Sequence, residues 1–194
     1  MKSVRAFAGV GVVLGLCGLA SASVTPNTYE IRVSNVVSPG MPSTTVEVYA
    51  VWDSDLYYAF QGADWNLLGD GTGAFSGPAS AFAAPGQVGG TPTGGDVLGI
   101  VTGQIHMPMG GIFADTSHPI LLWTATWSTT DFTNRTVDLL TETDMYNLFS
   151  DASGVGADVT PTVLEAAGRI VVIPAPASLA LLGLGGLAAL RRRR

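Results

Sequence analysis

The sequence predicts an all-β protein, an antiparallel β-sandwich of jelly-roll type, with an apolar helix flanking it at each end of the chain. In Val46–Trp52 apolar and polar residues alternate, as they do on a strand with one buried face. Val, Thr, Tyr and Trp, which favour strands, gather in several such segments. Gly and Pro clusters separate these segments, and no long window between the two ends has helical spacing with caps. Many short strands joined by such turns are typical of a β-sandwich.

Eight segments are expected to be strands. They are Tyr29–Val33, Val46–Trp52, Leu56–Ala63, Val97–Val101, Ile120–Trp127, Arg135–Leu140, Met145–Leu148 and Arg169–Ile173. The residues expected on the apolar face of the fifth segment are Leu121, Trp123, Ala125 and Trp127. A single helical turn is expected near Pro161–Ala167. The stretch Ala74–Asp96 is rich in Gly, Ala, Pro and Ser, and we expect it to form a long loop across one end of the fold.

The N-terminus has the three parts of a secretory signal peptide. Two basic residues precede an uncharged apolar run, Ala6–Leu19, which leads into the A-x-A cleavage signal formed by Ala20 and Ala22. We therefore expect export, with signal peptidase removing residues 1–22; the alternative is an uncleaved membrane helix. Cys17, the single cysteine, lies in this run, so the mature chain has no thiol chemistry unless a lipoprotein signal makes Cys17 its first residue.

The C-terminus consists of a short proline motif, an apolar run and an arginine cluster, in that order. The motif residues are Pro174, Ala175, Pro176, Ala177 and Ser178. The apolar run is Leu179–Leu190, and the cluster comprises Arg191, Arg192, Arg193 and Arg194. An apolar helix of this length is somewhat shorter than the ~30 Å hydrocarbon core of a bilayer, and the arginines are expected on its cytoplasmic side.

This tail resembles the PEP-CTERM sorting signal of Gram-negative bacteria, which membrane protease-transpeptidases called exosortases recognise. Both prolines match the family motif, usually Val-Pro-Glu-Pro, whereas Ala175 stands where the family usually has Glu. The resemblance implies that residues 174–194 are a sorting signal. The chain would be held transiently in the cytoplasmic membrane, cut near Pro176 by an exosortase-type protease, and left in the cell envelope or outside the cell. A helix retained as a plain anchor is the alternative.

The segment between the two signals, residues 23–173, is expected to form one strongly acidic domain. Six of the nine basic residues lie in the signals, which leaves Arg32, Arg135 and Arg169 and no lysine. All fifteen acidic residues remain, so its formal charge is 3 − 15 = −12. A body of this charge does not bind the nucleic-acid backbone, so no nucleic-acid partner is expected.

Residue types that catalyse reactions or bind metals are present without a recognised motif. His106 and His118 lack the spacing of a zinc pair, and no Gly-x-Ser-x-Gly elbow occurs. We therefore predict no catalytic residue, no resident metal and no cofactor. Calcium is left open at Asp53–Asp55 and at Asp151–Asp158, although neither has the spacing of an EF-hand loop.

Two groups of residues leave sugar chemistry open. A glycoside hydrolase needs two carboxylates across a cleft, and Asp53, Asp55 and Asp64 lie in the sequence beside tryptophans. Exposed aromatic rings stack on sugars, and the candidates are Trp52, Trp65, Trp123 and Trp127. Strand spacing favours a core position for the last two.

The body is also similar in pattern to cohesin-type sandwiches. Ile112-Phe113, Asp115 and Pro119-Ile120 precede a long Trp/Thr strand, in the order found in the later half of cohesins. Cohesins are non-catalytic jelly-roll modules that bind dockerins, so the resemblance implies a fold rather than a partner. We therefore expect an exported, non-enzymatic protein of the envelope or extracellular matrix with a structural or adhesive role. A module that binds extracellular polysaccharide or protein is the alternative, and a glycoside hydrolase is the third hypothesis.

Overall fold

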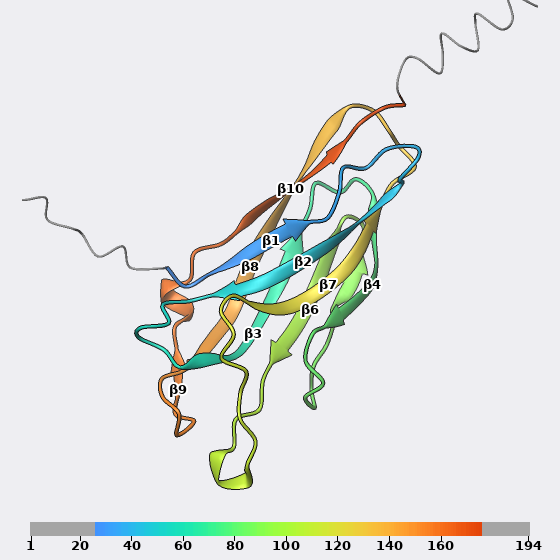
Figure 1. Ribbon diagram of the computed structural model, residues 1–194. Coiled ribbons are helices and arrows are strands. Elements are labelled where there is room, and N and C mark those ends of the chain that lie inside the picture. The colour runs from blue at the N-terminus through green and yellow to red at the C-terminus, as the bar shows by residue number, and fades with distance from the viewer. Residues whose placement is uncertain (1–25, 176–194) are drawn as a thin grey trace, which may run out of the picture.

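The computed structural model describes residues 26–175, which fold into two antiparallel β-sheets (Figure 1). One sheet has the strand order β1, β2, β7, β4, with bounds Thr28–Val33, Ser43–Val51, Ile120–Ser128 and Ala74–Ser80. The other has the order β10, β8, β3, β6, β5, with bounds Ala167–Val172, Arg135–Phe149, Ala59–Leu68, Asp96–Gly103 and Thr91–Thr93. Its sixth strand, β9 (Gly156–Asp158), pairs with β8. The all-β sandwich predicted from the sequence is confirmed.

Several expectations concern residues outside this range. They are the two terminal helices, the cleavage residues Ala20 and Ala22, the motif residues Pro176, Ala177 and Ser178, and the cluster Arg191–Arg194. Within residues 26–175 the helical elements are two 3-10 turns, η1 (Pro108–Gly110) and η2 (Thr160–Thr162). The turn η2 overlaps the start of the helical turn expected near Pro161–Ala167 but ends at Thr162. None of the helical turns in the described part of the chain is long and apolar enough to cross a membrane.

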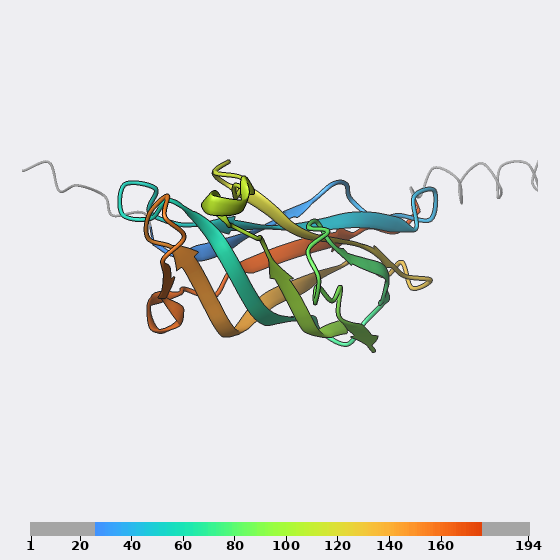
Figure 2. The same ribbon diagram turned by 90° about the horizontal axis from the view of Figure 1, so that it is seen from below.

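The two sheets form two layers (Figure 2), and backbone hydrogen bonds join the residues just before and after β1 to β10 and its flanking residues. The amide of Val37 donates to the carbonyl of Val171, and the amide of Ile173 donates to the carbonyl of Val37, both at 2.9 Å. Further along the same edge, the amide of Leu164 donates to the carbonyl of Asn27 at 2.8 Å. Backbone groups beyond both ends of the edge strand β1 are thus paired with the other sheet or its flanking residues.

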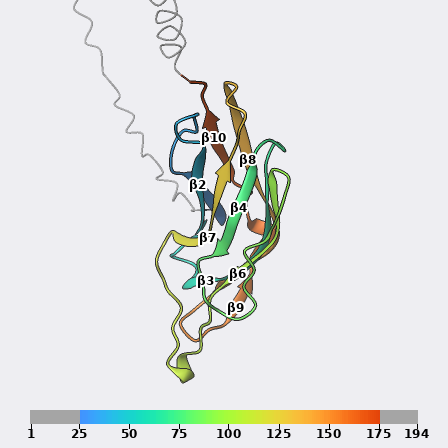
Figure 3. The same cartoon turned by 90° about the vertical axis from the view of Figure 1, so that its right-hand side faces the viewer.

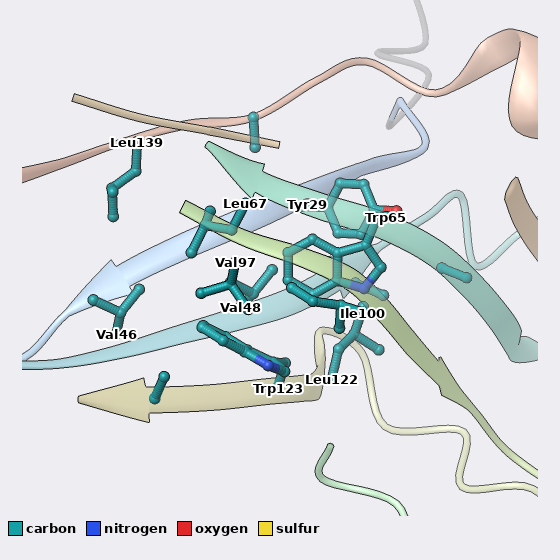
Figure 4. Packing of buried hydrophobic residues seen from close by; sticks show 14 of the residues in the cluster. Tyr29, Val46, Val48, Trp65, Leu67, Val97, Ile100, Leu122, Trp123 and Leu139 are labelled. Carbon is teal, nitrogen blue, oxygen red and sulfur yellow. The ribbon is translucent and has the colours of Figure 1, made fainter. Parts of the chain in front are cut away.

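Aromatic and aliphatic side chains fill the space between the sheets (Figure 4). Trp65 of β3 and Trp123 of β7 meet edge to face, with ring centroids 5.8 Å apart. The indole N–H of Trp123 donates to the carbonyl of Gly89 at 2.7 Å, and the ring of Tyr29 lies 5.3 Å from that of Trp65. Aromatic pairs contribute about 0.5–1.5 kcal/mol beyond the area that they bury. This cluster therefore ties β1, β3 and β7 together at the centre of the fold.

The expectation of a long loop over Ala74–Asp96 is wrong, because β4 and β5 lie within it. β4 pairs antiparallel with β7, and its Phe75 is buried in the core. The register of this pairing shifts around Gly77 and Pro78. Ala, Gly and Pro have weak strand propensity and concealed this strand in the sequence, whereas hydrogen bonds to β7 and the buried phenyl ring stabilise it.

A β-bulge in β7 changes which residue faces the core. Opposite Val48 and Tyr49 the register shifts, so that Leu122 is left without a partner and Leu121 pairs with Tyr49. The side chain of Leu122 is fully buried and that of Leu121 is half-buried, so the expectation that Leu121 lies on the apolar face is wrong. The residues after the bulge face the core as expected: Trp123, Ala125 and Trp127.

Several strand boundaries also differ from expectation, most notably those of β3 and β8. β3 begins at Ala59 rather than Leu56, because the amides of Leu56 and Tyr57 donate to the carbonyl of Asp53 and close a turn. The two segments expected at Arg135–Leu140 and Met145–Leu148 are one continuous strand, β8. The polar residues between them continue the ladder against β3.

A substitution at Gly73 can test how tightly the core is packed around Trp127. Gly73 and Gly71 have φ angles of 81° and 77°, but a Cβ on Gly73 would collide with the Trp127 ring, whereas one on Gly71 would meet no atom within 4 Å. Alanine at a left-handed position costs about 1–2 kcal/mol, and overpacking adds about 1–3 kcal/mol. We expect Gly73→Ala to lower the free energy of unfolding in urea by about 2–5 kcal/mol and Gly71→Ala by about 1–2 kcal/mol. Equal losses would show that the Trp127 contact is unimportant.

Because two tyrosines are buried, we expect the protein to lose stability in alkali. Burial raises the pKa of Tyr29 and of Tyr146 above the ordinary value of 10.0. Above pH 10 the unfolded chain therefore loses these protons while the folded chain keeps them, and the free energy of unfolding falls by up to about 1.4 kcal/mol per pH unit for each tyrosine. We expect urea denaturation between pH 9 and pH 12 to show this slope, and Tyr29→Phe to reduce it. An unchanged slope in the variant would contradict the prediction for Tyr29.

Candidate functional site

Three loops leave the sandwich at the same end. They connect β2 to β3 (residues 52–58), β6 to β7 (residues 104–119) and β8 to β9 (residues 150–155). The strand registers place them together, because Ala59 pairs with Phe149 and the start of β7 pairs with the end of β2. Residues 104–119, called the tip loop below, project furthest at this end (Figures 1 and 3). β10 finishes at the opposite end of the molecule.

The tip loop exposes a cluster of apolar side chains. Met109 is fully exposed and Phe113 is 66 % exposed. The complete set of exposed large apolar residues in this loop is Ile105, Met107, Met109, Ile112 and Phe113. Single exposed apolar residues are ordinary, but a group on one projection marks a surface that contacts another molecule. Residues 104–114 also contain no Asp, Glu, Lys or Arg.

Backbone hydrogen bonds hold the apex of the tip loop in one conformation. The amide of Met107 donates to the carbonyl of Ile112 at 2.8 Å, and the amide of Ile112 donates back at 3.1 Å. The 3-10 turn η1 connects these two residues, and the amide of Gly111 donates to the carbonyl of Pro108 at 3.1 Å. The apolar side chains are therefore presented on a short hairpin whose backbone polar groups are largely paired within it.

The tip loop has a first leg, which leaves β6, and a second leg, which returns to β7. The Gln104 side chain bonds to both legs and to the sandwich. Its side-chain amide donates to the carbonyls of Phe60 and Asp115, each at 3.1 Å. Its carbonyl oxygen accepts from the amide of Asp115 at 2.6 Å. One side chain thus connects the first leg of the loop to β3 and to the second leg.

His106 fastens the middle of the loop to a neighbouring loop. Its Nδ1 accepts from the amide of Ala114 at 3.0 Å, and its Nε2 lies 3.0 Å from the carbonyl of Ala152. Only the neutral ring with its hydrogen on Nε2 satisfies both bonds. The ring is 9 % exposed and packs against Tyr58 and Phe149 at 5.4 and 5.1 Å between centroids. His106 is therefore a structural tie between the three end loops.

His118 ties down the second leg of the tip loop. Its Nε2 accepts from the amide of Trp52 at 2.9 Å, and its ring meets the Trp52 indole edge to face at 4.6 Å. The polar side chains of Gln104, His106 and His118 thus bond inward, whereas the large apolar side chains of the loop point outward. This is the reverse of the usual distribution in a globular protein.

The end loops carry negative charge and no arginine or lysine. Their carboxylates are Asp53, Asp55, Asp115 and Asp151, which we call the acidic collar. A hydrogen bond from the side chain of Ser117 lowers the pKa of Asp115, and one from Ser153 lowers that of Asp151. These two carboxylates therefore stay ionised below the ordinary range for aspartate.

The carboxylates proposed for catalysis do not assemble into a site. Asp53 accepts the amide of Asp55 at 3.0 Å within a turn. Asp64 lies five residues into β3, about 17 Å along the strand from Ala59, which itself follows that turn. A glycoside hydrolase based on these three residues has no support in this geometry.

The residues considered for calcium are used in turns. Asp151 accepts the amide of Ser153 at 2.8 Å, and Asp158 accepts the amide of Thr160 at 3.0 Å. Such bonds are the ordinary role of aspartate in turns. Across residues 26–175, no group of three or more His, Cys, Asp or Glu is placed to hold a metal ion.

All four tryptophans lie in the core, each at most 1 % exposed: Trp52, Trp65, Trp123 and Trp127. The expectation was correct for the last two. Trp52 and Trp65 are not available as platforms for sugar stacking, because Trp65 packs between the sheets and Trp52 is covered by His118. None of the four tryptophans is therefore an exposed ring of the kind considered for sugar stacking.

The first two residues of the proline motif follow the fold directly. The last backbone hydrogen bond of the β10 edge is the one from Ile173 to Val37. Pro174 and Ala175 come next and are exposed, without secondary structure. The remaining motif residues, Pro176, Ala177 and Ser178, lie beyond the described range.

Comparisons with known proteins concern the fold. The chain is similar to the cohesin module of a family 33 glycoside hydrolase from Clostridium perfringens, with 10% identity and a TM-score of 0.42. The similarity covers 78% of this chain and 100% of that module. No protein-family model and no curated protein sequence matches the chain.

Reasoning from the sequence missed the tip loop as a site. It noted His106 and His118 as unpaired histidines and Ile112-Phe113 as part of a fold pattern, but did not connect them. A signal was present: large apolar residues and two glycines fall in an uncharged stretch between two strand segments. What the sequence did not show is that the polar residues of this stretch bond inward.

Gln104 provides a test of this structure. We expect Gln104→Ala to speed hydrogen exchange at the amides of Met107 and Ile112 by about tenfold or more, because three hydrogen bonds at the base of the loop are lost. Exchange in the strands should change little. Gln87→Ala is the matched control, since Gln87 makes its side-chain hydrogen bond to Ser80, outside the tip loop. Equal exchange at the apex in both variants would contradict the role of Gln104.

Proposed function

We propose that the chain is an exported, non-enzymatic module of the cell envelope or extracellular matrix, which is sorted by exosortase-type processing and contacts other molecules through its tip loop. Its role in this proposal is structural or adhesive. Residues 1–22 direct export and residues 174–194 direct sorting. The folded body between them presents the contact surface.

The observation that carries the proposal is that the tip loop and the start of the C-terminal tail lie at opposite ends of the folded body. The tip loop projects at one end, and β10 ends at the other, at Val172, two residues before Pro174 (Figures 1 and 3). A chain held at a membrane through its C-terminal tail therefore points the exposed apolar side chains away from that membrane. This orientation suits a displayed module that binds at a distance from its attachment.

The use of the polar residues supports a role without catalysis. Both histidines bond to backbone groups of the tip loop or of the two neighbouring end loops. The carboxylates Asp53, Asp151 and Asp158 each accept a backbone amide in a turn. These groups stabilise loops, and the surface that they support is apolar, which suits binding rather than acid–base chemistry.

Mass spectrometry of both termini of the native extracellular protein tests the sorting. We expect a mature chain that begins at Ser23 and ends near Pro176, without Arg194. Pro176→Ala should leave a larger fraction of the protein with its tail, because the motif is altered. Pro92→Ala, on exposed β5, is the matched control and should be processed normally. Mature extracellular protein with an intact Arg194 would overturn the sorting proposal.

A further inference from the structure

We infer that the tip loop inserts into an apolar groove with a basic rim on a partner protein. The inference rests on the proposed function only in treating the tip as the binding end. Its support comes from the shape, the chemistry and the charge of that end.

The shape of the tip requires a concave partner. The apex is a projection, and its backbone amides at Met107, Gly110, Gly111 and Ile112 already donate within the loop. A partner therefore gains little from pairing with the backbone and gains mainly by burying side chains. Met109 and Phe113 are the most exposed of these and are the anchors of the interaction. Phe and Met are enriched in protein interfaces, and Met adapts its shape to the groove that it enters.

The fixed conformation of the loop favours binding. Ordering a flexible loop on association costs free energy that is subtracted from the affinity. Here Gln104 and His106 already hold the loop, through bonds to Phe60, Asp115, Ala114 and Ala152. The apolar side chains are therefore presented before a partner arrives.

The acidic collar determines the charge of the partner. Among the described residues, the three arginines pair with Glu30, Asp131 and Asp138, all outside the end loops. The carboxylates of the collar thus have no cationic partner in the described part of the chain. A groove rimmed by Lys or Arg complements them, and charge complementarity of this kind increases association rates and selects partners.

The same charges disfavour the other occupants of an apolar tip. A second copy docked tip to tip would bring two acidic collars together, and like charges in contact oppose association. An anionic lipid surface would repel the collar in the same way. The membrane that holds the C-terminal tail lies at the opposite end of the molecule in the proposed arrangement. A protein groove with basic residues at its edge is the occupant that fits all three observations.

The probe is a synthetic helical-hairpin peptide whose two helices form a Leu-lined groove with Lys along both rims. It is titrated into the purified body, residues 23–175, and into the full chain. Isothermal titration calorimetry gives the affinity at low and high salt. We expect binding that weakens with salt, and a loss of about tenfold or more in Met109→Ser/Phe113→Ser, which leaves the net charge unchanged. Asp115→Asn/Asp151→Asn should also weaken binding, since asparagine preserves the turns while removing the charge.

The matched control is Leu98→Ser/Leu140→Ser, which removes two exposed apolar residues from the six-stranded sheet. It should bind the probe as the parent protein does. Equal losses of affinity in the control and in Met109→Ser/Phe113→Ser would mean that the peptide binds the acidic body without using the tip loop. That result would overturn the inference. Met109→Ser alone, at a side chain that is fully exposed, guards against misfolding as the cause of lost binding.

Two further measurements decide between occupants. Sedimentation velocity of the body, residues 23–175, should show a monomer, and flotation of the body with phosphatidylcholine or phosphatidylglycerol vesicles should show no binding. Self-association or vesicle binding that Met109→Ser abolishes would overturn the protein-groove inference in favour of a second copy or a lipid surface. These outcomes are separate from the sorting test: a retained Arg194 with tip-dependent peptide binding would reject the sorting and leave the docking surface in place.

Discussion

The edge-to-face contact between Trp65 and Trp123 is the interaction on which the arrangement of the rest depends. It joins β3, the central strand of the larger sheet, to β7, a central strand of the smaller one. Tyr29 of β1 packs against the Trp65 indole. Because side chains in a packed interior have little freedom, this contact fixes the two sheets relative to each other. The fixed sheets in turn determine where β2, β6 and β8 end, and therefore where the three end loops meet.

The tip loop is anchored to the fixed sheets and presents an exposed apolar surface. Gln104 and His106 reach inward to groups on β3 and on the β8–β9 loop, and their polar atoms are satisfied there. An unpaired buried polar atom costs about 1–3 kcal/mol, so these bonds hold the loop against rearrangements that would bury Met109 or Phe113 instead. The loop is therefore stable with its apolar residues in water. Exposed apolar residues lower solubility, and the proposed binding role gives a reason for keeping them exposed.

The parts of this structure that follow local rules could be predicted from the sequence, and the rest could not. Alternation identified β2 and most of β7, because one face of each is buried. It failed at Leu122, where a bulge moves one side chain into the core, and at β4, whose Ala, Gly and Pro residues form a strand only because β7 pairs with them. The tip loop needed contacts between residues as distant as Gln104 and Phe60, which no local pattern contains.

Two interactions of different range act at the end of the molecule that carries the tip loop. The carboxylates of the acidic collar act over about one Debye length, roughly 10 Å at 0.1 M salt, whereas Met109 and Phe113 act only on contact. Hydrogen bonds from Ser117 and Ser153 lower the pKa of Asp115 and Asp151, so these two carboxylates keep their charge at pH values below the ordinary range for aspartate. The described arginines are already paired elsewhere, so they do not cancel this field. A partner with basic residues is therefore oriented by the collar before the apolar side chains make contact, and the apex then determines how long it stays bound.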